Sequence, residues 1–150
     1  MKFVAFLPVM PPTANNAFAT VRGRRVLTKS QRDFRKVVSG VVSKAIPDDW
    51  EFVDVEIVLI PKRKMRFDVD NRIKPTLDAL TSCGFWKDDS QVASVYIQVS
   101  IPCEQEGTII TIKKAEKKYR PLRDLLPRLA DAIVFRCKEF FRRDKSEEEF

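Results

Sequence analysis

Two pairs of aspartates lie at the ends of one segment, residues 66–92, and their spacing suits the binding of a metal ion. We expect the stretch around Asp68 and Asp70 to be extended, so that the two alternate side chains share a face. Residues 73–80 space apolar side chains at helical intervals, and a helix there can bring Asp89 back towards the first pair. Three converging carboxylates are costly without a cation. The natural cation is a hard, oxygen-preferring ion such as Mg²⁺, with Mn²⁺ as a substitute.

The lysine between the two pairs, Lys74, allows two interpretations. Its charge can act at a phosphate or at a leaving oxygen, as metal-dependent phosphate chemistry requires. It can also form a structural i,i+4 ion pair with Asp70 or Asp78 on the helix. We expect Asp78 to be such a structural partner rather than a metal ligand. Asp88 is expected to be a further ligand or to lie directly behind the ligands.

A D-x-D pattern alone is weak evidence, because surface turns, Ca²⁺ loops and some sugar-nucleotide transferases contain it. A transferase is disfavoured by the lack of a glycine-rich phosphate loop. The sequence contains no histidine, which removes the commonest general base and the Ser-His and Cys-His pairs. Hydrolysis by this chain would therefore depend on carboxylates, metal ions and lysine.

The composition favours one globular domain with a polyanionic partner. The 150 residues are 44% hydrophobic and 33% charged, with a formal net charge of +7 and a pI near 9.5. A basic excess of this kind indicates nucleic acid, although many soluble proteins are simply basic. No apolar run reaches the roughly 18 residues that cross a bilayer, so no membrane partner is expected. Three widely spaced cysteines without a C-x-x-C pair suit a reducing, cytoplasmic compartment.

Hydrophobic periodicity and turn residues predict the elements that position the aspartates. Pro75 fits only the first turn of a helix, which places the helix start near Arg72–Lys74, and Gly84 should end it. The other expected elements are a strand over 2–7, a hairpin over 17–28, a helix from Thr28 or Ser30 to about Ala45, a strand over 51–60, a hairpin of strands over 92–101 and 108–114, and a helix over 121–143.

Basic side chains are expected to contact phosphates without reading sequence. One group lies in the connector immediately before the aspartates, where a solvated linker is the simpler alternative. The other lies at the tip of the predicted hairpin. The residues are Lys62, Arg63, Lys64, Arg66, Arg22, Arg24 and Arg25. Phe85 and Trp86 are expected to pack the turn after the helix rather than to stack on bases.

Residues 66–92 resemble the signature of the RusA family of Holliday junction resolvases, the phage and bacterial endonucleases that cut four-way DNA junctions. The family pattern is D-x-D-N-x-x-K-x-x-x-D-x-L followed by G-x-W-x-D-D-x-Q-V. An early P-P-x-x-N element is also present and adds Asn15 to the expected DNA contacts. The matching residues are Asp68, Asp70, Asn71, Lys74, Asp78, Leu80, Gly84, Trp86, Asp88, Asp89, Gln91, Val92, Pro11, Pro12 and Asn15.

The resemblance implies roles that the spacing alone leaves open. Asp68, Asp70 and Asp89 would be the catalytic, Mg²⁺-binding carboxylates, and Lys74 the catalytic lysine. The fold would be α+β, a small mixed β-sheet packed with two helices. Family members are homodimers that nick opposed strands of the junction, in DNA recombination and repair. Such an enzyme would work on DNA in the cytoplasm of a bacterial or phage-infected cell.

The resemblance covers roughly residues 3–114 and leaves the end of the chain unexplained. We therefore expect an endonuclease domain over 1–115 and a C-terminal helical extension over 116–150 with a disordered charged tail. The extension departs from the compact family members, and packing on the core is its default interpretation. The main alternative function is that of a non-catalytic junction- or DNA-binding protein in which the extension has altered the dimer.

Overall fold

The computed structural model of the chain describes residues 2–64 and 66–116. The helix expected over 121–143 and the charged tail lie outside these residues. None of the helices in the described ranges combines the length and apolarity that crossing a membrane requires.

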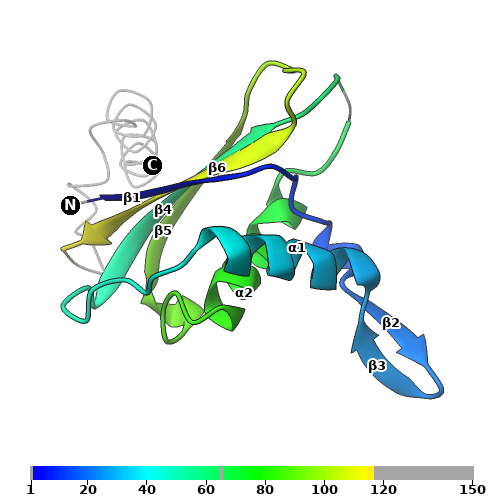
Figure 1. The fold of residues 1–150 in the computed structure, drawn as a ribbon, viewed down its shortest axis with the longest axis horizontal. Coiled ribbons are helices and arrows are strands. Elements are labelled where there is room, and N and C mark those ends of the chain that lie inside the picture. The colour runs from blue at the N-terminus through cyan, green and yellow to red at the C-terminus, as the bar shows by residue number, and fades with distance from the viewer. Residues whose placement is uncertain (1, 65, 117–150) are drawn as a thin grey trace, which may run out of the picture. The chain divides into compact units, whose positions relative to one another are not determined.

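A mixed sheet of four strands forms the centre of the described fold, in the order β1-β6-β4-β5 (Figure 1). Strand β4 pairs antiparallel with β6 and parallel with β5, and β6 pairs antiparallel with β1. The strand bounds are Lys2–Leu7 for β1, Phe52–Ile60 for β4, Val92–Val99 for β5 and Gly107–Ala115 for β6. The strands expected over 2–7 and 51–60 are thus confirmed.

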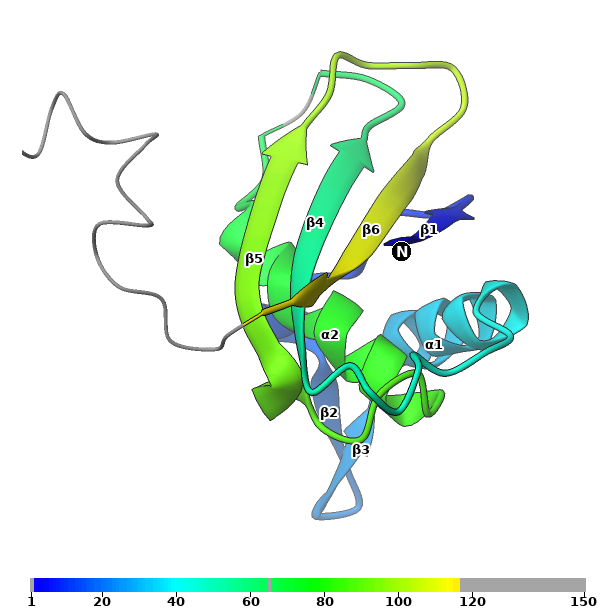
Figure 2. The same cartoon turned by 90° about the vertical axis from the view of Figure 1, so that its left-hand side faces the viewer.

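The expected hairpin of β5 and β6 is wrong, because β4 lies between these two strands. A parallel pair such as β4 and β5 needs a crossover, which here contains the helix between them. The chain then passes over the end of β4 before β6 begins, as Figure 2 shows. Backbone bonds from Ser100 N to Leu59 O and from Cys103 N to Pro61 O hold this crossing. The two strands were expected to pair because they are neighbours in sequence.

Two helices pack on one face of the sheet (Figures 1 and 2). They are α1, Lys29–Val41, and α2, Ile73–Ser82. Alternate residues of β4 are buried along its whole length and pack with helix side chains such as Phe34, Val38 and Leu80. Helix α1 ends four residues earlier than the expected Ala45. Its exposed Val41 does not belong to the buried stripe, while Val42 does.

A two-stranded hairpin projects beyond the helices (Figure 1). It consists of β2, Phe18–Val21, and β3, Arg24–Leu27, as expected over 17–28. Arg22 and Gly23 both have positive φ, 50° and 73°, which is the pattern of a type I′ turn. Thr28 occupies the N-cap position of α1 but does not cap it. Its hydroxyl instead donates to Asn16 O at 2.9 Å and joins the hairpin to the loop before it.

The described residues therefore form the expected α+β fold, a small mixed sheet packed with two helices. Strand β4 and helix α2 are consecutive in the chain, and their connection contains Asp68 and Asp70. The connection from α2 to β5 contains Asp88 and Asp89. The crossover that makes β4 and β5 parallel thus places both acidic pairs at the ends of one helix.

Candidate active site

The first acidic pair lies at the entry to α2. Asp70 opens a 3-10 turn, Asp70–Arg72, that runs directly into the helix. The extended conformation expected around Asp68 and Asp70 is therefore wrong from Val69 onwards, where φ and ψ are already helical. Asp68 precedes the turn, and Asn71 Nδ2 donates to its Oδ2 at 3.2 Å. Both aspartates are exposed, so their carboxylates are accessible to a cation.

Pro75 sits in the first turn of α2, as its missing amide requires. No side chain caps the helix: Asn71 bonds to Asp68 instead. Asp70 belongs to the 3-10 turn before α2. Lys74 precedes Asp78 by one helical turn, so this base and acid lie on the same side of the helix.

Lys74 forms an ion pair with Asp78, which confirms the structural i,i+4 pairing expected for this lysine. Its Nζ lies 2.9 Å from Asp78 Oδ1, and 68% of its side chain is exposed. The pKa of Lys74 is raised, chiefly because its ammonium donates this hydrogen bond and is attracted by the Asp78 carboxylate. Asp89 adds a smaller attraction. That Asp89 joins Asp68 and Asp70 around one ion stays a prediction.

Helix α2 ends as expected at Gly84, whose φ is +73°. Phe85 N donates to Leu80 O at 3.1 Å and Gly84 N to Thr81 O at 3.0 Å, the two bonds of a Schellman motif. Phe85 and Trp86 are buried, and Trp86 Nε1 donates to Thr81 Oγ1 at 2.7 Å. Both aromatic residues therefore pack the turn, and their burial leaves no face for a base.

The second acidic pair belongs to a short 3-10 turn, Asp89–Gln91, capped by Asp88. Asp88 Oδ1 accepts from Ser90 N at 2.8 Å. Gln91 Oε1 accepts from Asp88 N at 3.4 Å, which completes a capping box, and also accepts from Lys87 N at 2.9 Å. Asp88 is thus a structural cap of the turn that presents Asp89, and Asp89 is exposed.

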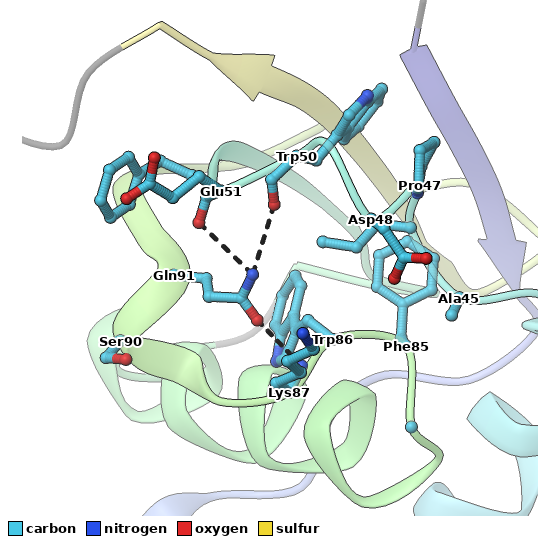
Figure 3. Close-up of a pocket in the computed structure, with 13 residues that line it drawn as sticks. Ala45, Pro47, Asp48, Trp50, Glu51, Phe85, Trp86, Lys87, Ser90 and Gln91 are labelled. Carbon is cyan, nitrogen blue, oxygen red and sulfur yellow. Dashed lines mark hydrogen bonds between the residues drawn. The ribbon is translucent and has the colours of Figure 1, made fainter.

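Gln91 also fastens this turn to the loop before β4 (Figure 3). Its Nε2 donates to Trp50 O and Glu51 O, each at 3.3 Å. One amide side chain therefore joins two segments that are 40 residues apart in the sequence. Gln91 is recognisable in the sequence only as a motif position, because its partners are backbone carbonyls that leave no pattern of residue types.

A hollow of about 600 Å³ lies beside this turn (Figure 3). Its walls combine aromatic side chains with polar groups of the loop before β4. The lining includes Ile46, Asp48, Trp50, Phe85, Trp86 and Lys87. A second hollow, of about 250 Å³, lies along the hairpin and is lined by Asn15, Phe18 and Arg25 among others. Arg25 lies over the ring of Phe18, 4.1 Å from its centroid.

The basic residues expected to contact DNA are all exposed: Lys62, Arg63, Lys64, Arg66, Arg22, Arg24 and Arg25, together with Asn15. They come from two places in the chain, the connector after β4 and the hairpin with the loop before it. Exposure of this kind is compatible with phosphate contact and equally with a solvated surface. Their assignment to DNA stays a prediction.

The oxygen donors suit Mg²⁺, but they are not gathered into a ready-made cage. In the described ranges, no three acidic, cysteine or histidine side chains are close enough together to hold a metal ion. Mg²⁺ is commonly bound by one or two carboxylates, several waters and the phosphates of the substrate. Exposed carboxylates at both ends of the α2 crossover fit that mode of binding.

Arg72 is a second residue whose contacts the sequence does not reveal. Its Nη1 donates to Pro11 O, and its Cζ lies 5.2 Å from the ring centroid of Phe67. Burial lowers the pKa of Arg72, and the charge of Glu106 opposes that effect. In the sequence Arg72 marks only the boundary of the helix, since its partner is 61 positions earlier.

Comparison with known proteins covers the same part of the chain. The family model described as "Endodeoxyribonuclease RusA" matches residues 8–113. Proteins named "Crossover junction endodeoxyribonuclease RusA" from Shigella sonnei and Escherichia coli K12 are each 33% identical over 102 residues. A protein of the same name from Enterobacteria phage 82 is 32% identical over 102 residues. Each alignment spans 66% of this chain and 83% of the relative. The chain belongs to the RusA endodeoxyribonuclease family.

Proposed function

We propose that this protein is a Mg²⁺-dependent, structure-selective DNA endonuclease that resolves Holliday junctions in DNA recombination and repair. The observation that carries the proposal is the family match over residues 8–113. That range contains both acidic pairs and Lys74, on the two connections of the α2 crossover. Mn²⁺ substitutes for Mg²⁺ because both prefer oxygen ligands.

Asp68, Asp70 and Asp89 hold the metal in this proposal. Their exposed carboxylates leave room for waters and for a DNA phosphate among the ligands. A bound Mg²⁺ supplies charge neutralisation at the phosphate and activation of the attacking water. Asp88 holds the turn that presents Asp89, through its bond from Ser90 N, and is not itself a ligand.

Lys74 acts as a positive charge and not as a base. Its raised pKa keeps the ammonium protonated at neutral pH. The side chain is largely exposed and held by one carboxylate, so it can exchange Asp78 for a DNA phosphate at little cost. In contact with that phosphate it stabilises developing negative charge on the oxygens.

Resolution without loose ends requires two symmetric cuts. We propose that a homodimer nicks opposed strands of the junction, one strand at each active site. The exposed basic residues of the connector and hairpin hold the arms of the four-way DNA by their phosphates. The enzyme works where that DNA lies, in the cytoplasm of a bacterial or phage-infected cell.

One observation favours a second candidate, a non-catalytic junction-binding protein. The described residues contain no preformed group of three metal-binding side chains. Cleavage of a synthetic four-way junction in Mg²⁺, with EDTA as the control, separates the two functions. Paired nicks that require Mg²⁺ support the enzyme. Tight junction binding without nicking in Mg²⁺ or Mn²⁺ supports the binding protein.

A further inference from the structure

Arg72 joins the acidic turn to a distant loop. It is the last residue of the turn that begins with Asp70, and its backbone N donates to Val69 O at 3.1 Å. Its side chain reaches Pro11 O. The turn that carries Asp70 is therefore attached through one guanidinium to the proline-rich loop, residues 8–13.

That loop is held at three alternate carbonyls, each by a side chain from a different element. Thr108 Oγ1 of β6 donates to Val9 O at 2.8 Å. Arg72 donates to Pro11 O, and Gln31 Nε2 of α1 donates to Thr13 O at 3.2 Å. Thr108 and Gln31 are both buried.

Prolines explain this unusual arrangement. Pro8, Pro11 and Pro12 have no amide hydrogen, so the loop cannot pair as a strand on both sides. Its carbonyls still need donors once they are covered by protein. Side chains supply those donors, and the result is a loop fixed to the sheet, to α1 and to the acidic turn.

The surroundings of Arg72 make its position demanding. Its guanidinium lies 5.2 Å from the ring centroid of Phe67, and Phe67 is the residue immediately before Asp68 in the sequence. Its Nε is buried and has no hydrogen-bond partner within residues 2–64 and 66–116. Leaving such a donor unpaired costs about 1–3 kcal/mol. Because Nε has no partner among the described residues, the position of the side chain depends on two other contacts, the bond from Nη1 to Pro11 O and the packing on the Phe67 ring.

We propose that Arg72 is a positioning residue that fixes the Asp70 turn against the proline-rich loop, so that the carboxylates of Asp68 and Asp70 are held ready for the metal and the DNA phosphate. Arg72 contacts the residues on both sides of Asp68: its guanidinium lies over the Phe67 ring, and its backbone N donates to Val69 O, between the two aspartates. The inference rests on the proposed metal-dependent activity. Residues behind metal ligands typically change metal affinity or activity about 10- to 100-fold when altered.

The test compares Arg72→Met, Arg72→Lys and, as a matched control, Thr108→Val. Thr108→Val loosens the same loop at Val9 without touching the acidic turn. Three properties are measured on the full-length chain: Mn²⁺ affinity by calorimetry, hydrogen exchange of residues 8–13 and 66–72, and the Mg²⁺ concentration that gives half-maximal junction cleavage. Junction affinity is measured in Ca²⁺.

We expect Arg72→Met to weaken Mn²⁺ binding about 10- to 100-fold, to raise the Mg²⁺ requirement similarly and to speed exchange in both segments. Junction affinity should change less than about twofold, because the guanidinium of Arg72 is already engaged by Pro11 O. Arg72→Lys should recover part of the metal affinity, because an ammonium can still donate to Pro11 O. Thr108→Val should speed exchange in residues 8–13 alone and leave the metal affinity unchanged.

Two results would overturn the proposal. One is a Mn²⁺ affinity in Arg72→Met within twofold of the wild type, despite faster exchange of the loop. The other is an equal loss of metal affinity in Thr108→Val, which would assign the effect to loop rigidity in general. A wild type that binds Mn²⁺ but cuts no junction would refute the proposed function instead, and the calorimetry would still decide the role of Arg72.

Discussion

Lys74 donates a 2.9 Å hydrogen bond to Asp78, one turn further along α2. Lys74 is the residue expected to act on the phosphate, whereas Asp78 is not expected to bind the metal. Asp89 lies near enough to add to the raised pKa of the lysine. Asp78 thus binds the ammonium that the proposed reaction needs, and the two residues should respond differently to mutation.

Lys74→Ala should slow cleavage about 100-fold, the usual effect of removing one group that stabilises charge in the transition state. Junction affinity should fall little, because one exposed lysine among many phosphate contacts contributes modestly. Single-turnover cleavage and gel-shift titration measure the two effects. A loss confined to binding would make Lys74 an ordinary phosphate contact.

Asp78→Asn should lower the pKa of Lys74 while leaving the cleavage rate within a few fold of wild type. The sign follows from the hydrogen bond, which stabilises the charged ammonium and raises its pKa in the folded protein. The stabilisation is fully present below the unfolded-state pKa and is lost as pH rises through the folded-state pKa. NMR titration of labelled lysine side chains measures the folded-state pKa of Lys74 in the wild type and in Asp78→Asn. An unchanged Lys74 pKa in Asp78→Asn would contradict the pairing.

Gln91→Glu should destabilise the turn that carries Asp89. The substitution keeps the shape of the side chain but replaces the donor to Trp50 O and Glu51 O with a carboxylate oxygen. Two carbonyls would then face a negative charge, at a cost of about 1–3 kcal/mol. Urea unfolding measures the loss, and cleavage should also slow. Gln98→Glu, an exposed position on β5, is the control, and an equal effect there would reject a specific role for Gln91.

The double variant Lys62→Gln/Arg63→Gln should reduce the salt dependence of junction binding. Each phosphate contact contributes about one unit to the slope of log K against log salt, so the slope should fall by about two. Lys113→Gln serves as the control, because Lys113 is exposed on β6 and its register partner on β4 is Asp54, on the face opposite the buried β4 residues. Equal slopes for the double variant and wild type would show that the connector is only solvated.

Local chemistry predicted the elements around the site. Pro75 predicted the start of α2, Gly84 predicted its end, and hydrophobic periodicity predicted the strand β4, all confirmed. The Lys74–Asp78 pair was also recognisable, since residues four apart are neighbours on a helix. In each case, the cause lies within a few residues of its effect.

Long-range relationships were not predictable in the same way. The predicted pairing of β5 with β6 is wrong, because both strands pair with β4 instead. That arrangement depends on the crossover between β4 and β5 and not on the residues that connect β5 to β6. The 3-10 turn at Asp70 was missed because the stretch before a helix has no periodicity of its own. The bonds of Arg72 and Gln91 end on backbone carbonyls 61 and 40–41 positions away, and a carbonyl is present at every residue.

The most direct test of the metal-dependent endonuclease is the behaviour of Asp68→Asn, Asp70→Asn and Asp89→Asn on a synthetic four-way junction. Each change keeps the size of the side chain and removes the negative charge that a metal ligand needs. Binding in Ca²⁺ and cleavage in Mg²⁺ are measured on the same preparations. All three variants should bind the junction as tightly as wild type and leave it uncut. Normal cleavage by these variants would contradict the assignment of the site.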